Sequence, residues 1–197
     1  MRRLVGRMIG IAVAAVAVSG CGASPKARFY TLDAVAVADG APAATWTVAV
    51  GPVTVPAAVD RPQLVVQVAP NRVELDEFNR WAGPLDDGIG AAVAQNLSTL
   101  LGTPHVVAGV IPGFDPAYRV RIDVQRFEST PGRDVLVDAA WIVSAAAGGP
   151  PRSGRTVARE PAAGEEVAAV AAAHSRALAT VSADIAKAIR DQAGRRR

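Results

Sequence analysis

A segment near the middle of the chain alternates strictly between apolar and charged residues, and it sets the strongest limit on the fold. The apolar members are Tyr118, Val120, Ile122 and Val124, and the charged members are Arg119, Arg121 and Asp123. Successive side chains of a strand point to opposite faces, so this pattern predicts a strand with one buried and one solvated face. A second strand over 135–143 is expected to pair with it as a hairpin after the Pro131–Gly132 turn. The fold must therefore contain a sheet whose apolar face other elements cover.

Two amphipathic helices are available to cover that face. The first is predicted from about Pro84 to Leu101, with Asp86 and Asp87 near its start and Gly102 at its end. Its apolar stripe consists of Leu85, Ile89, Val93, Leu97 and Leu100. The second is predicted from about Glu165 to Arg190. Its stripe consists of Val167, Val170, His174, Leu178, Val181, Ile185 and Ala188.

Shorter β-prone stretches complete the expected sheet. They are residues 29–32, 46–55, 63–68, 72–75, 105–108 and 155–159. Gly51–Pro52 interrupts the second of them, which predicts an edge position, a bend or a bulge because proline has no N–H to donate. The sequence thus predicts a mixed α/β class: a single domain in which a mixed β-sheet packs with two main amphipathic helices.

The first 20 residues have the layout of a secretory signal peptide. Three arginines within the first seven residues precede an apolar stretch from Met8 to Val18, which is shorter than the ~20 residues of a membrane-spanning helix. Val18-Ser19-Gly20-Cys21 resembles the bacterial lipobox, in which the cysteine thiol takes a diacylglycerol and the chain is cut just before it. The alternative is an ordinary signal followed by a chance cysteine. Cys21 is the only cysteine in the chain, which favours lipidation at this residue.

The remaining chain divides into a tether, a domain and a tail. We predict a signal peptide over 1–20, a lipidated tether over 21–28, one domain over 29–193 and a basic tail over 194–197. Seven extended residues reach only ~23–25 Å, so the folded body is expected close to the membrane. The terminal Arg195–Arg197 run is expected to fray in solvent, with contact to anionic lipid or a partner as the alternative. A second cysteine for an internal disulfide is missing, so core packing must hold the domain.

Charge and residue usage exclude several functions. Removing residues 1–20 takes away three arginines, which leaves 18 basic and 18 acidic side chains, so a basic nucleic-acid-binding surface is not expected. The two lysines left, Lys26 and Lys187, lie in no phosphate-binding loop. His105 and His174 are far apart, and the one thiol is committed to lipid, so we predict no metal site and no cofactor besides the covalent lipid.

A serine hydrolase is the enzymatic alternative. His174 lies next to Ser175, and Ser98 and several aspartates are also present, but no Gly-x-Ser-x-Gly elbow occurs. Because His174 falls on the apolar stripe of the last helix, we interpret it as a packed, hydrogen-bonded core residue. We predict that the chain is not an enzyme.

Arginine and tryptophan gather in two short stretches that suggest a binding surface. They are Arg61-Pro62 and Asn79-Arg80-Trp81-Ala82, the second followed by Pro84-Leu85. Arginine and tryptophan are frequent in interface hot spots. The alternative is structural: Trp81 anchors the first helix to the sheet while Arg80 stays in water.

Several strings along the mature chain resemble the auxiliary lipoproteins of ABC-type transport systems, the PqiC-like family. The strings are FYTL from Phe29, VAVGPVTVPAAVDRPQLV from Val48, NRVELDEFNRWAGPLDDGI from Asn71, YRVRIDVQRFE from Tyr118, VDAAW from Val137, and AHSRALATVSADIAKAI from Ala173. The usual acidic residue after the Trp-Ala pair is Gly83 here, and the usual leucine before Asp-Arg-Pro is Val59.

The resemblance implies a non-catalytic accessory subunit of an intermembrane lipid transport system. Its implied partners are an MCE-domain protein, a permease and a cytoplasmic ATPase, with a ring-like homo-oligomer as one arrangement. The implied location is the outer membrane, facing the periplasm, and Gly22 after Cys21 permits that delivery under the enterobacterial sorting rule. A structural or assembly lipoprotein of another envelope complex is the second hypothesis, and a periplasmic hydrolase is the third.

Overall fold

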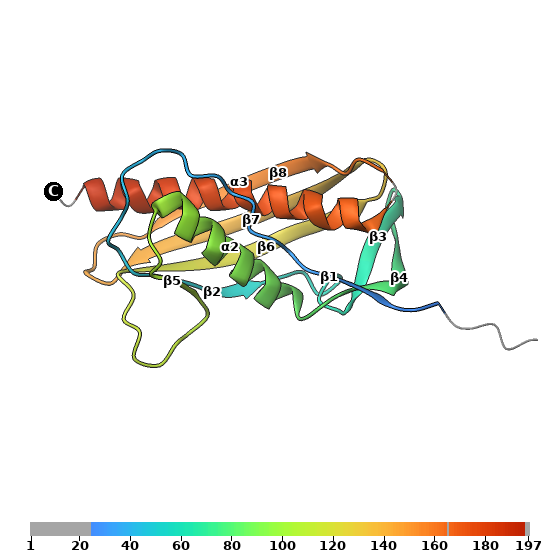
Figure 1. Ribbon diagram of the computed structural model, residues 1–197, viewed down its shortest axis with the longest axis horizontal. Helices are drawn as coiled ribbons and strands as arrows, with labels where there is room; N and C mark the ends of the chain where they lie inside the picture. The colour runs from blue at the N-terminus through green and yellow to red at the C-terminus, as the bar shows by residue number, and fades with distance from the viewer. Residues whose placement is uncertain (1–24, 165, 196–197) are drawn as a thin grey trace, which may run out of the picture.

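The alternating segment forms the first part of a 13-residue strand at the centre of a five-stranded sheet. In the computed structural model, which describes residues 25–164 and 166–195, this strand is β6 (Tyr118–Thr130). The sheet has the order β5-β2-β6-β7-β8 (Figure 1). Its other strands are β2 (Val48–Thr54), β5 (Val106–Ala108), β7 (Asp134–Ala145) and β8 (Arg152–Pro161). β2 pairs in parallel with β5 and β6, whereas β6–β7–β8 are antiparallel.

The alternation in β6 produces the predicted two-faced strand. Tyr118, Val120, Ile122 and Val124 are at most 4 % exposed. A bulge between Val124 and Arg126 shifts the register against β7 by one residue. Because of that extra residue, Phe127 and Ser129 return to the buried face, and the strand continues beyond the predicted segment.

The remaining strands form a second, three-stranded sheet of order β1-β4-β3. Its members are β1 (Arg28–Tyr30), β3 (Gln63–Ala69) and β4 (Arg72–Trp81). β3 and β4 form a hairpin that turns at Asn71, whose φ of 60° is left-handed, and β1 lies parallel to the end of β4. Gln63 pairs with Arg80 and Leu64 pairs with Asp76, so the three residues 77–79 bulge out of β4.

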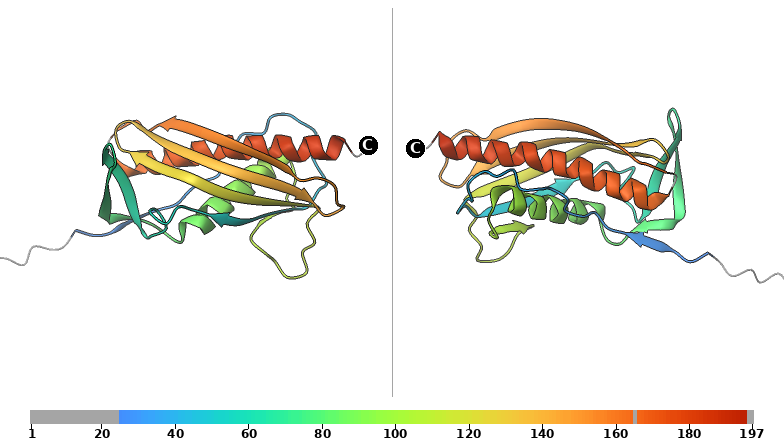
Figure 2. Two further views of the ribbon diagram at one scale, coloured as in Figure 1. Left: turned by 180° about the vertical axis from the view of Figure 1, so that it is seen from behind. Right: turned by 45° about the horizontal axis from the view of Figure 1, so that its top comes forward.

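Both helices lie on one face of the five-stranded sheet. α2 (Leu85–Leu101) packs against β2 and β5, and α3 (Val167–Gly194) packs against β7 and β8. The view from behind in Figure 2 shows strands β6, β7 and β8 with no helix in front of them. The predicted stripe of α2 is at most 7 % exposed, and Gly102 ends the helix with a left-handed φ of 63°.

Residues 31–44, here called the strap, cross both helices before the chain enters β2 (Figure 1). The contacts that hold the strap are Asp33 N–H to Ser175 Oγ (3.0 Å), Ala36 N–H to Asn96 Oδ1 (2.9 Å), Ala44 N–H to the Leu101 carbonyl (2.8 Å), and Arg190 to the Asp39 carboxylate (2.6 Å). The buried polar residues Asn96 and Ser175 therefore serve as partners for strap backbone groups.

The structure confirms the mixed α/β class, the single domain and the two main helices, and it refines several local expectations. The strands divide between two sheets, because β3 and β4 pair with β1 and not with the strands that follow. The Gly51–Pro52 step coincides with a bulge against β6, and β5 pairs only with Val48–Val50, so Pro52 lies where β2 has a strand on one side. Pro84 stands at the N-cap of α2, and α3 continues to Gly194. Glu165 lies outside the described residues.

Tight packing between β7 and β8 yields a stability prediction. Gly154 is paired with Trp141, and a Cβ at Gly154 would overlap the six-membered ring of Trp141. That ring is fixed because its Nε1–H donates to Thr156 Oγ1 (3.0 Å), whose hydroxyl donates to Asp184 of α3 (2.7 Å). Gly154→Ala is expected to lower the free energy of unfolding in urea by about 1–3 kcal/mol. Gly83→Ala is the matched control, since a Cβ at Gly83 meets nothing within 4 Å, and equal stability of the two variants would contradict this packing.

Candidate functional site

The structure brings together the two short stretches that sequence reasoning singled out. The Trp81 N–H donates to the Pro62 carbonyl at 2.8 Å, and Gln63 pairs with Arg80 across the sheet. Arg61 and Pro62 are exposed at the start of β3, so these residues and Arg80 form one corner of the three-stranded sheet. This corner is the candidate contact surface, and its role stays a prediction.

Trp81 supports this corner from inside. Its side chain is only 7 % exposed, and its ring meets Phe127 of β6 and His174 of α3 edge to face, with centroids 6.1 and 6.3 Å apart. Such contacts stabilise aromatic pairs beyond the area they bury. Trp81 therefore connects the three-stranded sheet to the five-stranded sheet and to α3, and little of it is available to a partner.

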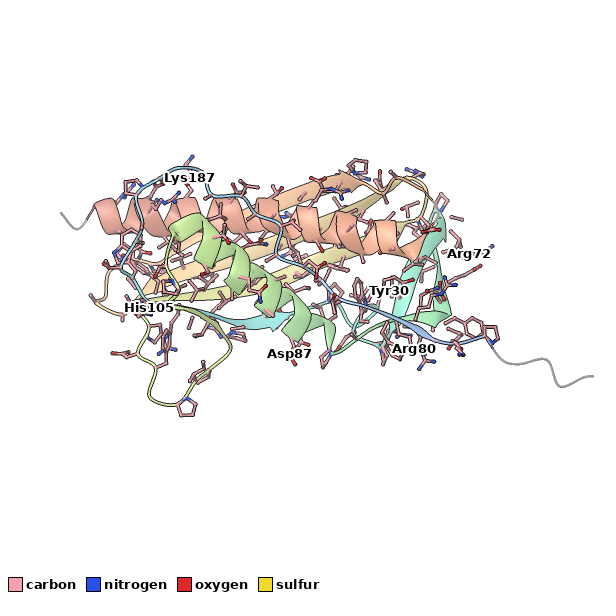
Figure 3. All side chains as sticks on the ribbon, viewed as in Figure 1. Tyr30, Arg72, Arg80, Asp87, His105 and Lys187 are labelled. Carbon is pink, nitrogen blue, oxygen red and sulfur yellow. The ribbon has the colours of Figure 1, made fainter. Side chains whose placement is uncertain are left out.

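Arg80, in contrast, remains accessible at the surface. Its Nε–H donates to the Glu77 carbonyl at 3.1 Å, its guanidinium lies 3.8 Å from the Glu77 carboxylate, and its side chain is 37 % exposed. Figure 3 places Arg80, Tyr30 and Arg72 at the end of the molecule where the chain leaves the tether. The sequence-based alternative, in which Arg80 stays in water, agrees with this exposure.

An apolar cavity of about 320 Å³ opens beside the corner, between β1, the end of β4 and the first turns of α2. Its lining residues include Tyr30, Leu32, Trp81, Pro84 and Leu85, with Asp87 contributing a carboxylate. Sequence reasoning missed this cavity, because its walls come from segments about 50 residues apart that β1–β4 pairing joins. FYTL at Phe29 predicted a strand and no cavity wall, and Trp81 with Pro84-Leu85 was singled out from the sequence only as part of a binding surface. The lining suits an apolar group and offers no charged partner for an anion.

His174 occupies the core and not a catalytic site. It is 0 % exposed, stacks on Phe127 with centroids 3.8 Å apart, and its Nε2 lies 2.8 Å from Ser129 Oγ. Burial lowers the pKa of His174 to about 3, so the ring is neutral at ordinary pH. Its Nδ1 has no hydrogen-bond partner, so the carboxylate that orients the base in a catalytic triad is missing among the described residues.

The serines considered for a hydrolase also have structural roles. Ser175 Oγ accepts from the Asp33 N–H and donates to the Ala171 carbonyl (2.9 Å), and Ser98 Oγ donates to the Thr103 carbonyl (2.7 Å). Over residues 25–164 and 166–195, His, Asp and Glu form no group of three or more that could hold a metal ion. In the same part of the chain, neither helix combines the length and hydropathy that a membrane span requires.

The uncovered face of the five-stranded sheet carries charged side chains, many of them paired. Arg155 binds the Asp138 carboxylate through two hydrogen bonds (2.7 and 2.6 Å), and Arg126 binds Glu128 in the same way (2.7 and 2.8 Å). The hydrogen bonds from Arg155 lower the pKa of Asp138, which is itself buried. Arg119 and Arg121 are exposed on β6, in the sequence-predicted positions. Ile142 (41 % exposed) and Val157 (58 % exposed) place apolar side chains among these charges.

Comparison with known proteins gives a family match and two similar folds. The family model for the ABC-type transport auxiliary lipoprotein component matches residues 30–186. A crystal structure of an uncharacterized protein is 22% identical, with a TM-score of 0.69, and the match covers 84% of this chain and 99% of that one. XCC0632 from Xanthomonas campestris, of the DUF330 family, is 21% identical with a TM-score of 0.69, covering 86% and 100%. At such identities the likeness shows the fold alone, and no curated protein matches the chain.

The buried neutral His174 predicts a stability that depends on pH. The unfolded state takes up a proton near the ordinary histidine pKa of 6.5, whereas the folded state resists protonation down to about 3. Stability is therefore complete above pH 6.5 and falls as the pH drops through that value, by about 2 kcal/mol at pH 5. Urea unfolding at pH 7 and pH 5 measures this loss. His174→Gln is expected to be less stable at pH 7 but to lose much less between the two pH values, and equal slopes for both proteins would refute the assignment.

Proposed function

Because the chain belongs to the family of ABC-type transport auxiliary lipoprotein components, we propose that it is the non-catalytic accessory subunit of an MCE system that moves lipids between membranes. The observation that carries this proposal is the match over residues 30–186, which spans both sheets, α2 and most of α3. A non-catalytic role agrees with the position of His174, the candidate base of a hydrolase, which is fully buried in the core. The family match supports the auxiliary role, and the lipid substrate and the MCE-domain partner are what we propose beyond it.

The subunit would be held in the outer membrane, facing the periplasm, by lipid on Cys21. Cys21 and the signal peptide over 1–20 lie outside the described residues, so this anchor rests on the Val18–Cys21 sequence and on Gly22. A lipid anchor with two or more acyl chains gives lasting membrane residence. Arg28, at the end of the predicted tether, is the first residue of β1, so the tether leads directly into a sheet.

In this role the subunit acts by position. It would dock an MCE-domain protein, whose permease and ATPase lie at the other membrane, and it supplies no chemistry or energy of its own. The N-terminal end of the body, with β1, faces the bilayer, which leaves the opposite end and the sheet faces for protein contacts. A ring of several copies is one arrangement that would enclose a path for lipid.

The structure bears differently on the two alternative functions, a structural lipoprotein of another complex and a periplasmic hydrolase. A structural lipoprotein of another envelope complex would use the same anchor and fold, so only its partner distinguishes it. A periplasmic hydrolase centred on His174 is disfavoured by the burial of that ring and by the structural bonds of Ser175 and Ser98.

Affinity purification tests the proposed partner. The tagged natural chain, extracted from membranes in mild detergent, is expected to bring down an MCE-domain protein, detected by mass spectrometry. An equally tagged, unrelated outer-membrane lipoprotein serves as the control for shared membrane location. Recovery of a different envelope complex with no MCE protein would contradict the proposal.

Substitution of the lipidated residue tests the anchor separately. Cys21→Ser removes the thiol that takes the lipid, so the exported protein is expected to leave the membrane fraction on carbonate washing or to remain uncleaved. Mass spectrometry of the N-terminal fragment of the natural mature protein should show the mass added by the lipid. Retention of Cys21→Ser on washed membranes, in cleaved form, would count against lipid anchoring.

A further inference from the structure

The end of the body that receives the tether exposes two aromatic rings. Phe29 of β1 is 64 % exposed and Phe78 of β4 is 45 % exposed. Phe29 pairs with Arg80 in the parallel ladder, two residues along β4 from Phe78, so the two rings belong to neighbouring strands. Single exposed apolar residues are ordinary on a folded surface, whereas apolar side chains grouped together mark contact sites.

The bulge in β4 explains why Phe78 is exposed. Residues 77–79 are skipped by the backbone ladder to β3, and the Asp76 carboxylate accepts hydrogen bonds from the N–H groups of Phe78 (3.1 Å) and Asn79 (3.0 Å). This side chain replaces the ladder partners that the bulge removes and holds Phe78 outside the regular sheet. The exposed ring is therefore part of a defined local structure.

Cationic side chains surround these rings. The segments that meet here, residues 25–30, 60–63 and 76–81, contain Lys26, Arg28, Arg61 and Arg80 against the acidic Asp60, Asp76 and Glu77, and Asp76 is already bonded to the backbone of the bulge. Among residues 25–164 and 166–195, Arg80 is the one of these four cations with an ion pair, a long contact to Glu77 at 3.8 Å. We call Phe29, Phe78 and these four cationic residues the tether corner.

The length of the tether decides which surface the tether corner meets. Arg28 is seven residue steps after Cys21, a reach of at most ~25 Å even when fully extended. If Cys21 carries lipid, as the proposed function requires, Lys26, Arg28 and Phe29 cannot move far from the headgroups. Apolar rings that enter the interface, flanked by cations that attract anionic lipid, are the chemistry of a peripheral membrane contact.

We infer that the tether corner is a second membrane-binding element, which rests on the anionic lipid surface beside the anchor and fixes the orientation of the domain. The inference depends on the lipid anchor of the proposed function. It also identifies what Arg61 and Arg80 contact: lipid headgroups, with Trp81 as the buried support of the corner. The loop 109–117, where Val110 is 87 % exposed, lies away from the tether end of the domain (Figure 1).

A fluorescent probe on Phe78 tests the contact, because Phe78 is remote in sequence from the anchor. The lipidated full chain carrying Phe78→Cys is labelled with an environment-sensitive dye and reconstituted in vesicles of phosphatidylethanolamine and phosphatidylglycerol. The dye is expected to shift its emission to the blue and to be quenched by spin-labelled lipid. The matched control carries Val110→Cys, whose dye is expected to be quenched by aqueous iodide and not by lipid.

Charge variants of the labelled protein test the cationic residues. Arg28→Glu and Arg61→Glu are each expected to weaken the lipid contact at Phe78 at least about fivefold, since one cation near an anionic surface is worth about that factor. Raising the salt concentration should also weaken the lipid contact at Phe78, because salt screens the attraction between the cations and the anionic lipid. Arg119→Glu, on the uncovered face of the five-stranded sheet, is the matched control and is expected to leave the signal unchanged.

The outcomes separate this inference from the proposed function. A protein that enters vesicles through its lipid but exposes the Phe78 dye to iodide as fully as the Val110 dye would overturn the membrane contact alone. Shielding of Phe78 only after an MCE-domain protein is added would also overturn it, and would make the tether corner a protein interface. A chain that carries no lipid and does not enter vesicles would overturn the anchor and the tether corner together.

Discussion

The stacked contact between Phe127 and His174, closed at its edge by Trp81, is the interaction on which the two-sheet arrangement depends. Each ring comes from a different part of the fold: β6, α3 and the end of β4. The only cysteine lies at position 21, so no cross-link joins these parts and packing alone must hold them. A histidine performs this role only as the neutral ring, since a charged one would be too costly to bury. The corner that faces the tether is consequently fixed to the body by aromatic packing.

Local periodicity predicted the elements well and their partners poorly. The alternation at Tyr118 and the four-residue steps from Leu85 reflect burial on one face, which a strand or helix carries in its own sequence. The end of β4 has no such pattern, because residues 77–79 bulge out of the ladder to β3 and break the alternation of buried and exposed side chains. The Asp76 carboxylate binds the N–H groups of Phe78 and Asn79 in that bulge. Polar Asn96 and Ser175 on apolar helix faces made sense only once the strap supplied their partners.

The candidate site was predictable in composition but not in role. Arg61-Pro62 and Arg80-Trp81 do meet, because the Pro62 carbonyl accepts from Trp81 across the sheet. Residue type alone could not show that Trp81 faces inward while Phe78 is exposed, since that difference arises from a three-residue bulge. The apolar cavity beside Tyr30 was not predictable at all, for its walls meet only through tertiary pairing.

The strap has a consequence for the order in which the chain becomes structured. Asp39 is held by Arg190 and the Asp33 N–H by Ser175, separations of 151 and 142 residues. Contacts so distant in sequence form late, because the intervening loop must close first. During synthesis the strap emerges early, whereas α3, which holds its Asp33 and Asp39 ends, is made last. The strap is thus among the first segments to be made and among the last to be fastened to the body.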